Sequence, residues 1–208
     1  MNVVHKTIIR QFCKPRGLLG ALAGIIMRVR PSNRLRSIRT LELLHICPGD
    51  RVLEIGFGPG LAVARAAQLA TQGKVVGIDH SELMLRHARR RNAVAIRAGR
   101  VELLLGSADA LPRFDAAFNK VLAINVNMFW KDPASVLKGL RSVMKPGGVI
   151  ALTHQPRLPG ATRADADAAA ERMASFLQAA GFGEVHVEMV EMWPVAAACV
   201  LGRNEPSV

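Results

Sequence analysis

The feature that most constrains the fold is a short apolar strand that runs directly into three closely spaced glycines, Arg51-Val-Leu-Glu-Ile-Gly-Phe-Gly-Pro-Gly60. The turn Pro48-Gly49-Asp50 marks the N-terminal limit of this strand. The three glycines allow the backbone to turn sharply and to approach a ligand where a Cβ atom would collide. An apolar helical pattern starts at Leu61. A strand, a glycine-rich turn and a helix in this order are typical of the nucleotide-binding unit of a doubly wound α/β sheet.

The chain of 208 residues continues this alternation of strand and helix patterns. Strands are expected at 52–55, 75–78, 101–105, 118–124, 149–153, 185–190 and 196–201. Helices are expected at 60–71, 81–92, 132–144 and 164–180. The segment Lys145-Pro-Gly-Gly148 is predicted as the turn before the fifth strand. These units predict an α/β fold, a Rossmann-like seven-stranded and mainly parallel sheet with helices on both faces.

Residues 1–46 are predicted to form a helical N-terminal extension. A first helix is expected over 18–29, ended by Pro31, and Ser32 or Asn33 is expected to cap a second helix. The apolar face of the second helix is predicted to consist of Leu35, Ile38, Leu41, Leu44 and His45. We interpret the extension as a lid over a ligand pocket. The alternative is a basic amphipathic segment that makes peripheral contact with a membrane surface.

The charge balance is strongly basic, with 28 Lys and Arg against 16 Asp and Glu and a net charge of +12. The excess is concentrated in residues 1–41, which contain nine basic residues and no acidic one, and in the arginines between Arg86 and Arg100. This asymmetry indicates an anionic partner, either a nucleic acid, a membrane surface or an acidic small molecule. The alternative is a basic surface that serves only solubility.

The cysteines predict whether the protein holds a metal ion and in which cellular compartment it lies. Cys13, Cys47 and Cys199 have no metal-ligand spacing and are too few for a disulfide scaffold. We therefore expect no metal site and a reducing, cytoplasmic location. The apolar run 17–27 is too short to cross a bilayer, and no signal-peptide cleavage site follows it.

Polar side chains are predicted at four successive strand ends. Glu54 lies beside the glycine loop, and Asp79 ends the second strand. Asp109 and Asn125 follow the third and fourth strands. Ligands of open α/β sheets bind at the carboxyl ends of the strands, where a carboxylate after the second strand can accept both hydroxyls of a ribose. Because interior strand positions are almost wholly apolar in this sequence, packing does not account for these four residues.

The glycine spacing argues against a dinucleotide ligand. The spacing is Gly-x-Gly-x-Gly, and Leu61 stands where the third glycine of the dinucleotide pattern would be. Glu54 also places a negative charge beside a loop that would have to hold a pyrophosphate. A carboxylate in this position favours a ligand with an amino or sulfonium group. A phosphate-binding P-loop does not occur in the sequence.

Four motifs then follow one another along the chain: Glu54-Ile-Gly-Phe-Gly-Pro-Gly60, Gly77-Ile-Asp79-His-Ser, Ser107-Ala-Asp109 and Lys145-Pro-Gly-Gly148. Together they resemble the motifs of class I S-adenosylmethionine-dependent methyltransferases, most closely the small UbiE-like or type 11 group. The resemblance spans about residues 48–153 and implies a methyltransferase domain over 47–208. It also implies S-adenosylmethionine as cofactor and S-adenosylhomocysteine as product. It specifies the cofactor far more narrowly than the acceptor.

The resemblance implies a place for each part of the cofactor. The loop Gly56–Gly60 would pass under its methionine part, with Glu54 at the amino group. Asp79 would bind the ribose hydroxyls, while Asn125 and Val126 would face the methyl-donor end. Taken together, the implied cofactor-binding residues are Glu54, Gly56, Phe57, Gly58, Gly60, Asp79, His80, Met84, Ala108, Asp109, Asn125 and Val126.

The adenine end is implied to contact four of these residues. His80 and Met84 would flank the ring, and Asp109 would accept a hydrogen bond from the adenine amino group near the backbone of Ala108. For His80 the alternative is a solvent-facing loop residue. For Met84 it is ordinary packing of the helix.

The acceptor side is predicted after the fourth and fifth strands. Methyl transfer from a sulfonium is an in-line displacement, so the protein contributes mainly alignment and exclusion of water. Phe129 and Trp130 are predicted to bind the acceptor. His154 is a candidate general base, or else a hydrogen-bonding residue at a strand end. Under the lid interpretation, the acceptor side would be lined further by Phe12, Leu18 and Leu22.

Three functions stay open on this basis. The first is a methyltransferase for a small-molecule acceptor, hydrophobic or anionic. The second is a nucleic-acid methyltransferase acting on RNA, which the basic charge favours. Against it, the stretch Asn125-Val-Asn-Met-Phe-Trp130 has no Pro-Pro of the kind that amino-methylating enzymes use to hold a flipped base. The third is a non-catalytic regulator that binds S-adenosylmethionine.

Overall fold

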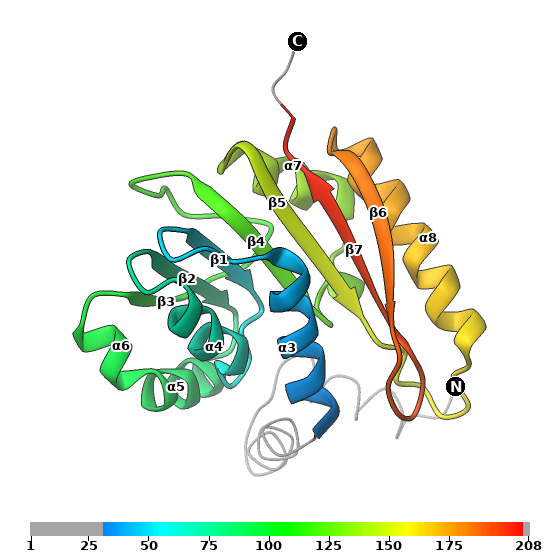
Figure 1. Cartoon of the computed structure of the whole chain (residues 1–208), viewed down its shortest axis with the longest axis horizontal. Helices are drawn as coiled ribbons and strands as arrows, with labels where there is room; N and C mark the ends of the chain where they lie inside the picture. The colour runs from blue at the N-terminus through cyan, green and yellow to red at the C-terminus, as the bar shows by residue number, and fades with distance from the viewer. Residues whose placement is uncertain (1–30, 206–208) are drawn as a thin grey trace.

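The computed structural model of the protein describes residues 31–205. Its centre is a seven-stranded sheet with the strand order β3-β2-β1-β4-β5-β7-β6 (Figure 1). The strands are β1 Arg51–Ile55, β2 Lys74–Asp79, β3 Val101–Leu105, β4 Phe118–Ile124, β5 Met144–His154, β6 Gly183–Val190 and β7 Ala197–Arg203. The first five strands are mutually parallel, and β7 runs antiparallel to both β5 and β6. The mainly parallel, seven-stranded sheet predicted from the sequence is confirmed.

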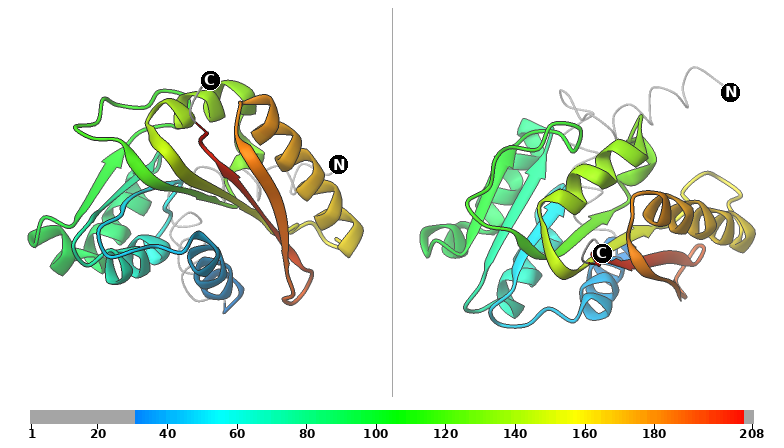
Figure 2. Two further views of the ribbon diagram at one scale, coloured as in Figure 1. Left: turned by 45° about the horizontal axis from the view of Figure 1, so that its top comes forward. Right: turned by 90° about the horizontal axis from the view of Figure 1, so that it is seen from above.

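Helices cover both faces of the sheet. They are α3 Pro31–Leu44, α4 Leu61–Leu69, α5 Glu82–Arg91, α6 Ala93–Arg97, the 3₁₀ helix η1 Asn127–Phe129, α7 Pro133–Ser142 and α8 Arg163–Ala179. The helices α3, α4 and α5 share one apolar cluster with the strands, and α7 and α8 share the other. Figure 2 shows α3 on the opposite side of the sheet from α7 and α8. The sheet is therefore buried between two helix layers, which explains why its strands read as nearly continuous apolar runs.

The carboxyl edge of the sheet is where the sequence places the ligand. The ends of β1, β2, β3, β4 and β5 meet at this edge because these strands are parallel. The loop between β6 and β7 reaches the same edge, since β6 is antiparallel to β7 and thus parallel to β5. The residues that follow all six strands are consequently neighbours across the edge, although the sequence separates them widely.

The predicted turn at Lys145-Pro-Gly-Gly148 is corrected by the structure, because these residues belong to β5, which begins at Met144. The segment is irregular: Gly147 has a φ of 75°, and the pairing of β4 with β5 shifts between Phe118 and Lys120. Two backbone hydrogen bonds with Asn204 hold the segment in the sheet. The Gly147 N–H donates to the Asn204 carbonyl at 2.7 Å, and the Asn204 N–H donates to the Gly148 carbonyl at 2.8 Å. The short helix α6 was not predicted from the sequence.

The start of α3 differs from the prediction. The helix begins at Pro31, so neither Ser32 nor Asn33 precedes it as a cap. Proline at the first helical position costs no hydrogen bond, because the N–H groups of the first turn have no partner within a helix. The expected first helix over 18–29 and the acceptor-side residues Phe12, Leu18 and Leu22 lie outside the described residues. The division of the chain into 1–46 and 47–208 stays a prediction.

The buried face of α3 is also partly different from the prediction. Leu41 and Leu44 are buried as expected, but Leu35 is exposed and His45 lies beyond the end of the helix. In place of Leu35, the inward positions are taken by three polar residues, Arg36, Ser37 and Thr40. Arg36 and Thr40 are stable there because they find hydrogen-bond partners at the end of β5, described below, and the Ser37 hydroxyl donates to the Asn33 carbonyl within α3 at 2.9 Å.

Among the described residues, no helix has both the length and the apolar character needed to cross a bilayer.

Candidate active site

The glycine turn after β1 is closed by packing that leaves no space for side chains at two positions. Gly56 has a φ of 71°, and a Cβ atom there would lie 2.3 Å from Cγ1 of Val126. Gly60 has a φ of 74° and precedes α4, where a Cβ atom would lie 2.8 Å from Cβ of Ala88. The backbone therefore follows a path that only glycine allows, close to the ends of β1 and β4.

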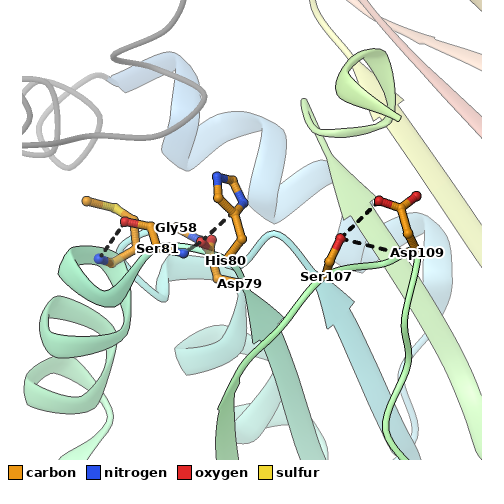
Figure 3. A network of polar contacts seen from close by, with 7 residues as sticks. Gly58, Asp79, His80, Ser81, Ser107 and Asp109 are labelled. Carbon is orange, nitrogen blue, oxygen red and sulfur yellow. Dashed lines mark hydrogen bonds and ion pairs between the residues drawn. The ribbon is translucent and has the colours of Figure 1, made fainter. Parts of the chain in front are cut away.

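Asp79 at the end of β2 is fixed by backbone donors from both sides. The N–H of Gly58 donates to Oδ2 at 2.8 Å, and the N–H of Ser81 donates to Oδ1 at 2.9 Å (Figure 3). Burial raises the pKa of Asp79, and the hydrogen bonds from Ser81 and Gly58 oppose that shift. His80 is exposed, with Nδ1 3.9 Å from Oδ1 of Asp79. Asp79 thus joins the glycine loop to the start of α5, which Ser81 caps.

Glu54 is the second acid at this edge and is almost completely buried. Burial raises the pKa of Glu54 to about 8, with repulsion from Asp79 as the second cause and a hydrogen bond from the backbone of Val63 as a partial offset. Its Oε2 atom is buried and has no hydrogen-bond partner among the residues that the structure describes. A buried carboxylate oxygen without a partner is unfavourable, so this atom is suited to a cationic donor from a ligand.

The segment after β3 carries Asp109 on a short turn. The hydroxyl of Ser107 donates to Oδ2 of Asp109 at 3.1 Å, and the N–H of Asp109 lies 3.4 Å from that hydroxyl (Figure 3). Asp109 is exposed, while Ala108 is buried and packs against the core. The acidic side chain and its backbone are therefore presented at the carboxyl edge with their orientation set locally.

Two of the predicted cofactor-binding side chains, Phe57 and Met84, are buried in the apolar core. Phe57 is buried within the α3–α4–α5 cluster and lies below the loop, against Gly77. Met84 is buried in the same cluster, and its N–H donates a hydrogen bond to the side chain of Ser81, the N-cap of α5. For Met84 this arrangement matches the packing alternative. The predicted contacts of Phe57 and Met84 with the cofactor stay predictions.

Asn125 at the end of β4 has a structural partner. Its φ is 55°, a left-handed conformation that asparagine tolerates better than most residues. Its Oδ1 accepts the N–H of Gln155 at 2.8 Å, and its own N–H donates to the Thr153 carbonyl at 2.8 Å. The side chain of Asn125 therefore joins the ends of β4 and β5. Val126 is half-buried and packs over Gly56, which follows β1.

The predicted acceptor side is partly apolar and exposed. In η1, directly after β4, Met128 is 45% exposed and Phe129 is 44% exposed. Trp130 is half-buried and packs against the core. His154 ends β5, and burial lowers its pKa to about 4, with the positive charges of Arg172, Arg36 and Arg157 as further causes. The imidazole is consequently neutral at pH 7.

A polar network that was not predicted from the sequence supports this side. Gln155 is buried, accepts a hydrogen bond from Nη1 of Arg36, and donates to the Val195 carbonyl at 2.7 Å. Thr40 of α3 and Thr153 of β5 are joined through their hydroxyls at 2.7 Å. The one available signal was a polar residue, Gln155, directly after a strand end. Its partner on α3 lies 119 positions away, which a local pattern does not reveal.

No group of three or more His, Cys, Asp or Glu side chains within residues 31–205 is arranged to hold a metal ion.

Known proteins are similar to this chain in sequence and in fold. A family described as "Methyltransferase domain" matches residues 52–148. A solved S-adenosylmethionine-dependent methyltransferase from Aquifex aeolicus superposes with a TM-score of 0.67 at 21% identity, covering 84% of this chain and 93% of that one. The uncharacterized methyltransferase YdaC of Bacillus subtilis is 31% identical over 190 residues, which cover 88% of this chain and 98% of YdaC. The chain belongs to the class I S-adenosylmethionine-dependent methyltransferases.

A second relative is similar over part of its length. The demethylmenaquinone methyltransferase of Symbiobacterium thermophilum is 40% identical over 110 residues, which cover 50% of this chain and 42% of that enzyme. The methyltransferase described here thus spans less than half the length of that relative.

The residues at the carboxyl edge fit the cofactor of this methyltransferase family, S-adenosylmethionine. The unpartnered Oε2 of Glu54 suits an ammonium donor, and the fixed carboxylate of Asp79 has lone pairs left for hydroxyl donors. The glycines of the turn add no side chains to the space beside these two acids. The predicted assignment of individual residues to individual parts of the cofactor stays a prediction.

Proposed function

We propose that this methyltransferase transfers a methyl group to a small-molecule acceptor by in-line displacement. The observation that carries the proposal is the set of exposed apolar side chains in η1, Met128 and Phe129, directly beyond the β4 end. Side chains in this position can bind an apolar molecule next to the methyl-donor end of the cofactor. The relative named a demethylmenaquinone methyltransferase supports an acceptor with a hydrophobic body.

The cofactor side of the mechanism depends on fixed polar groups. S-adenosylmethionine, when bound, supplies a methyl group made electrophilic by its sulfonium. Asp79 would accept hydrogen bonds from the ribose, and the N–H groups of Gly58 and Ser81 keep its carboxylate in one orientation. Glu54 would accept from the amino group through the oxygen that has no other described partner. Asp109 would accept from the adenine.

The acceptor side of the mechanism depends on alignment. The hydrogen bond from the Gln155 N–H to Asn125 fixes the β4 and β5 ends relative to each other, and these ends carry the two sides of the reaction. Phe129 and Trp130 would exclude water from the reacting atoms. The low pKa of His154, about 4, makes its imidazole a weak base, so we assign it a hydrogen-bonding role toward the acceptor. Its predicted role as general base stays a prediction.

A methyl-transfer experiment on a fractionated cell extract tests the proposal. Purified protein and methyl-tritiated S-adenosylmethionine are incubated with the extract, and label is counted in aqueous metabolites, organic-extractable lipids and nucleic acid. Asp79→Ala should abolish transfer because it removes the carboxylate that the two backbone donors fix. Glu171→Ala removes an exposed carboxylate from α8 and should retain it. These two variants change the net charge equally.

The distribution of label separates the three candidate functions. Label in either small-molecule fraction that Asp79→Ala abolishes and Glu171→Ala retains supports the proposal. Label in RNA would replace it with nucleic-acid methylation, which the net charge of +12 favours. Cofactor binding by calorimetry without transfer into any fraction would favour a non-catalytic binding protein. The cytoplasmic location expected from the cysteines stays a prediction.

A further inference from the structure

A group of arginines converges beside the end of β5, outside the cofactor side of the site. Oδ1 of Asn33, in the first turn of α3, accepts hydrogen bonds from two guanidinium groups. One is Nη2 of Arg36, and the other is Nη2 of Arg157 at 2.6 Å, from the loop after β5. Two nitrogens that donate hydrogen bonds to the same oxygen atom are separated by no more than roughly 6 Å. The fold therefore holds two positive charges close together.

The inner of these two arginines is rigidly placed. Arg36 is 3% exposed, and its Nη1 donates to Oε1 of Gln155. Gln155 is itself 1% exposed and is fixed by the Val195 carbonyl and by Asn125. The guanidinium thus reaches this place through a buried network and is not a surface side chain that could turn away. Arg157, in contrast, is exposed and can contact a ligand.

Burial lowers the pKa of the His154 ring, and the positive charges of three arginines act on the ring and lower it further. The positive charges acting on its ring come from Arg172 on α8, Arg36 on α3 and Arg157 in the adjoining loop. Its Nδ1 is buried and has no hydrogen-bond partner in the part of the chain that the structure describes. A neutral imidazole carries one ring N–H, which can donate a hydrogen bond to an anion beside the clustered cations.

Three acidic side chains of α8 and of the loop after β6 have partners of their own. Asp167 and Glu191 pair with Arg163, and Asp165 caps the start of α8, where Arg172 also lowers its pKa. The chain before Glu42 contains no acidic residue at all. The part of α3 before Glu42 therefore supplies cations and no carboxylate to this end of β5.

We infer that Arg157, together with Arg36 and His154, binds an anionic group of the methyl acceptor, either a carboxylate or a phosphate. The site lies at the β5 end, and Asn125 ties it to the β4 end beside the glycine turn. An acceptor that fits has an apolar body for Met128 and Phe129 and an acidic group for the arginines. The inference rests on the proposed function and extends it to a class of acceptor. The planar fork of a guanidinium matches both carboxylate and phosphate oxygens.

The first test measures anion binding without methyl transfer. The proton signals of the His154 ring, assigned with His154→Gln, are titrated with pH by NMR in inorganic phosphate, in benzoate and in chloride at equal ionic strength. A bound anion offsets the arginine charges, so phosphate or benzoate should move the midpoint upward, toward the ordinary value of 6.5. Whichever of the two anions acts more strongly identifies the preferred acid group.

Two variants decide whether the arginine pair is responsible. Arg157→Gln should bind the anion at least about tenfold more weakly, because it removes the charge-assisted hydrogen bonds. Arg89→Gln removes the same charge from the exposed surface of α5 and should respond like the unaltered protein. An equal response in Arg157→Gln, or no response of the unaltered protein to either anion, would overturn the inference.

The second test examines the charge of the methylated product. Tritiated product should pass a low-molecular-weight filter and bind to an anion exchanger at neutral pH. Product that passes both unretained would overturn the acidic acceptor while leaving small-molecule methylation intact. Label held back by the filter as nucleic acid would overturn both, and so would a complete absence of transfer.

Discussion

The two halves of the carboxyl edge differ in charge and in how their polar groups are held. At the ends of β1 and β2, Glu54 and Asp79 present carboxyl groups. At the end of β5, Arg36 and Arg157 present guanidinium groups around His154. The ammonium group of the cofactor would meet acidic groups that can accept its hydrogen bonds, and an acidic group on the acceptor would meet the guanidinium groups. The difference thus orders the two ligands along the edge.

The contacts also differ in their span along the chain. Asp79 is held by Ser81, two positions away, and by Gly58, 21 positions away. On the acceptor half, Asn33 and Arg157 are 124 positions apart. The contacts that hold Asp79 therefore form within a short stretch of chain, whereas the arginine pair exists only when α3 is packed on the sheet. Four substitutions test this contrast, from the largest expected effect to the smallest.

Gly56→Ala should have the largest effect, since it strains the turn where the halves meet. The new Cβ atom would lie 2.3 Å from Val126, at a φ of 71°. We expect a loss of about 4 kcal/mol in the free energy of unfolding, measured by urea denaturation. Gly58→Ala has a similar φ of 52° and meets nothing within 4 Å, so it should cost only about 1 kcal/mol. Equal losses for the two variants would disprove the role of the Val126 contact.

Asp79→Asn should weaken cofactor binding about 100-fold, because an amide replaces the carboxylate that accepts charge-assisted hydrogen bonds. Calorimetry with S-adenosylhomocysteine measures this loss. Arg157→Gln should leave that affinity within about twofold of the unaltered protein, since its contacts lie on the other half. A comparable loss in Arg157→Gln would show that the two halves are not separate.

Glu54→Gln should change how stability depends on pH. The native state keeps a proton on Glu54 up to a pKa of about 8, whereas the unfolded chain releases it near 4.5. The free energy of unfolding of the unaltered protein therefore falls as pH rises between these values. Relative to it, the variant should gain about 2 kcal/mol between about pH 6 and pH 8. Thermal or urea unfolding at both pH values measures the gain, and a constant difference would contradict the raised pKa.

Thr153→Val should have the smallest effect and should be confined to the acceptor half. It removes the hydroxyl that contacts Thr40 at 2.7 Å and Cys199 at 3.2 Å, while Thr40 keeps its bond to the Arg36 carbonyl. We expect a loss of about 1 kcal/mol in unfolding free energy. Affinity for S-adenosylhomocysteine should not change. A change in that affinity would mean that α3 packing reaches the cofactor.

The same contrast explains what could be predicted from the sequence. Strands and the glycine turn were predictable because period, turn residues and motif spacing act over a few positions. Asp79 was recognisable at its strand end for the same reason. Gln155 and Arg36 were not, since each looks like an ordinary polar residue until the fold places one against the other. The buried face of α3 was misjudged for this reason too, because apolar periodicity gives no weight to polar residues that find buried partners.

The position of β7 has a consequence for synthesis. This strand lies between β5 and β6, although β6 precedes it in the chain. As the polypeptide leaves the ribosome, each of the strands from β2 to β5 can pair with a strand that has already been made. β6 emerges with no edge to join, because its only neighbour in the sheet is the strand still to be made. Translation therefore finishes the cofactor half first and leaves an open strand edge on β5 until the final strand arrives.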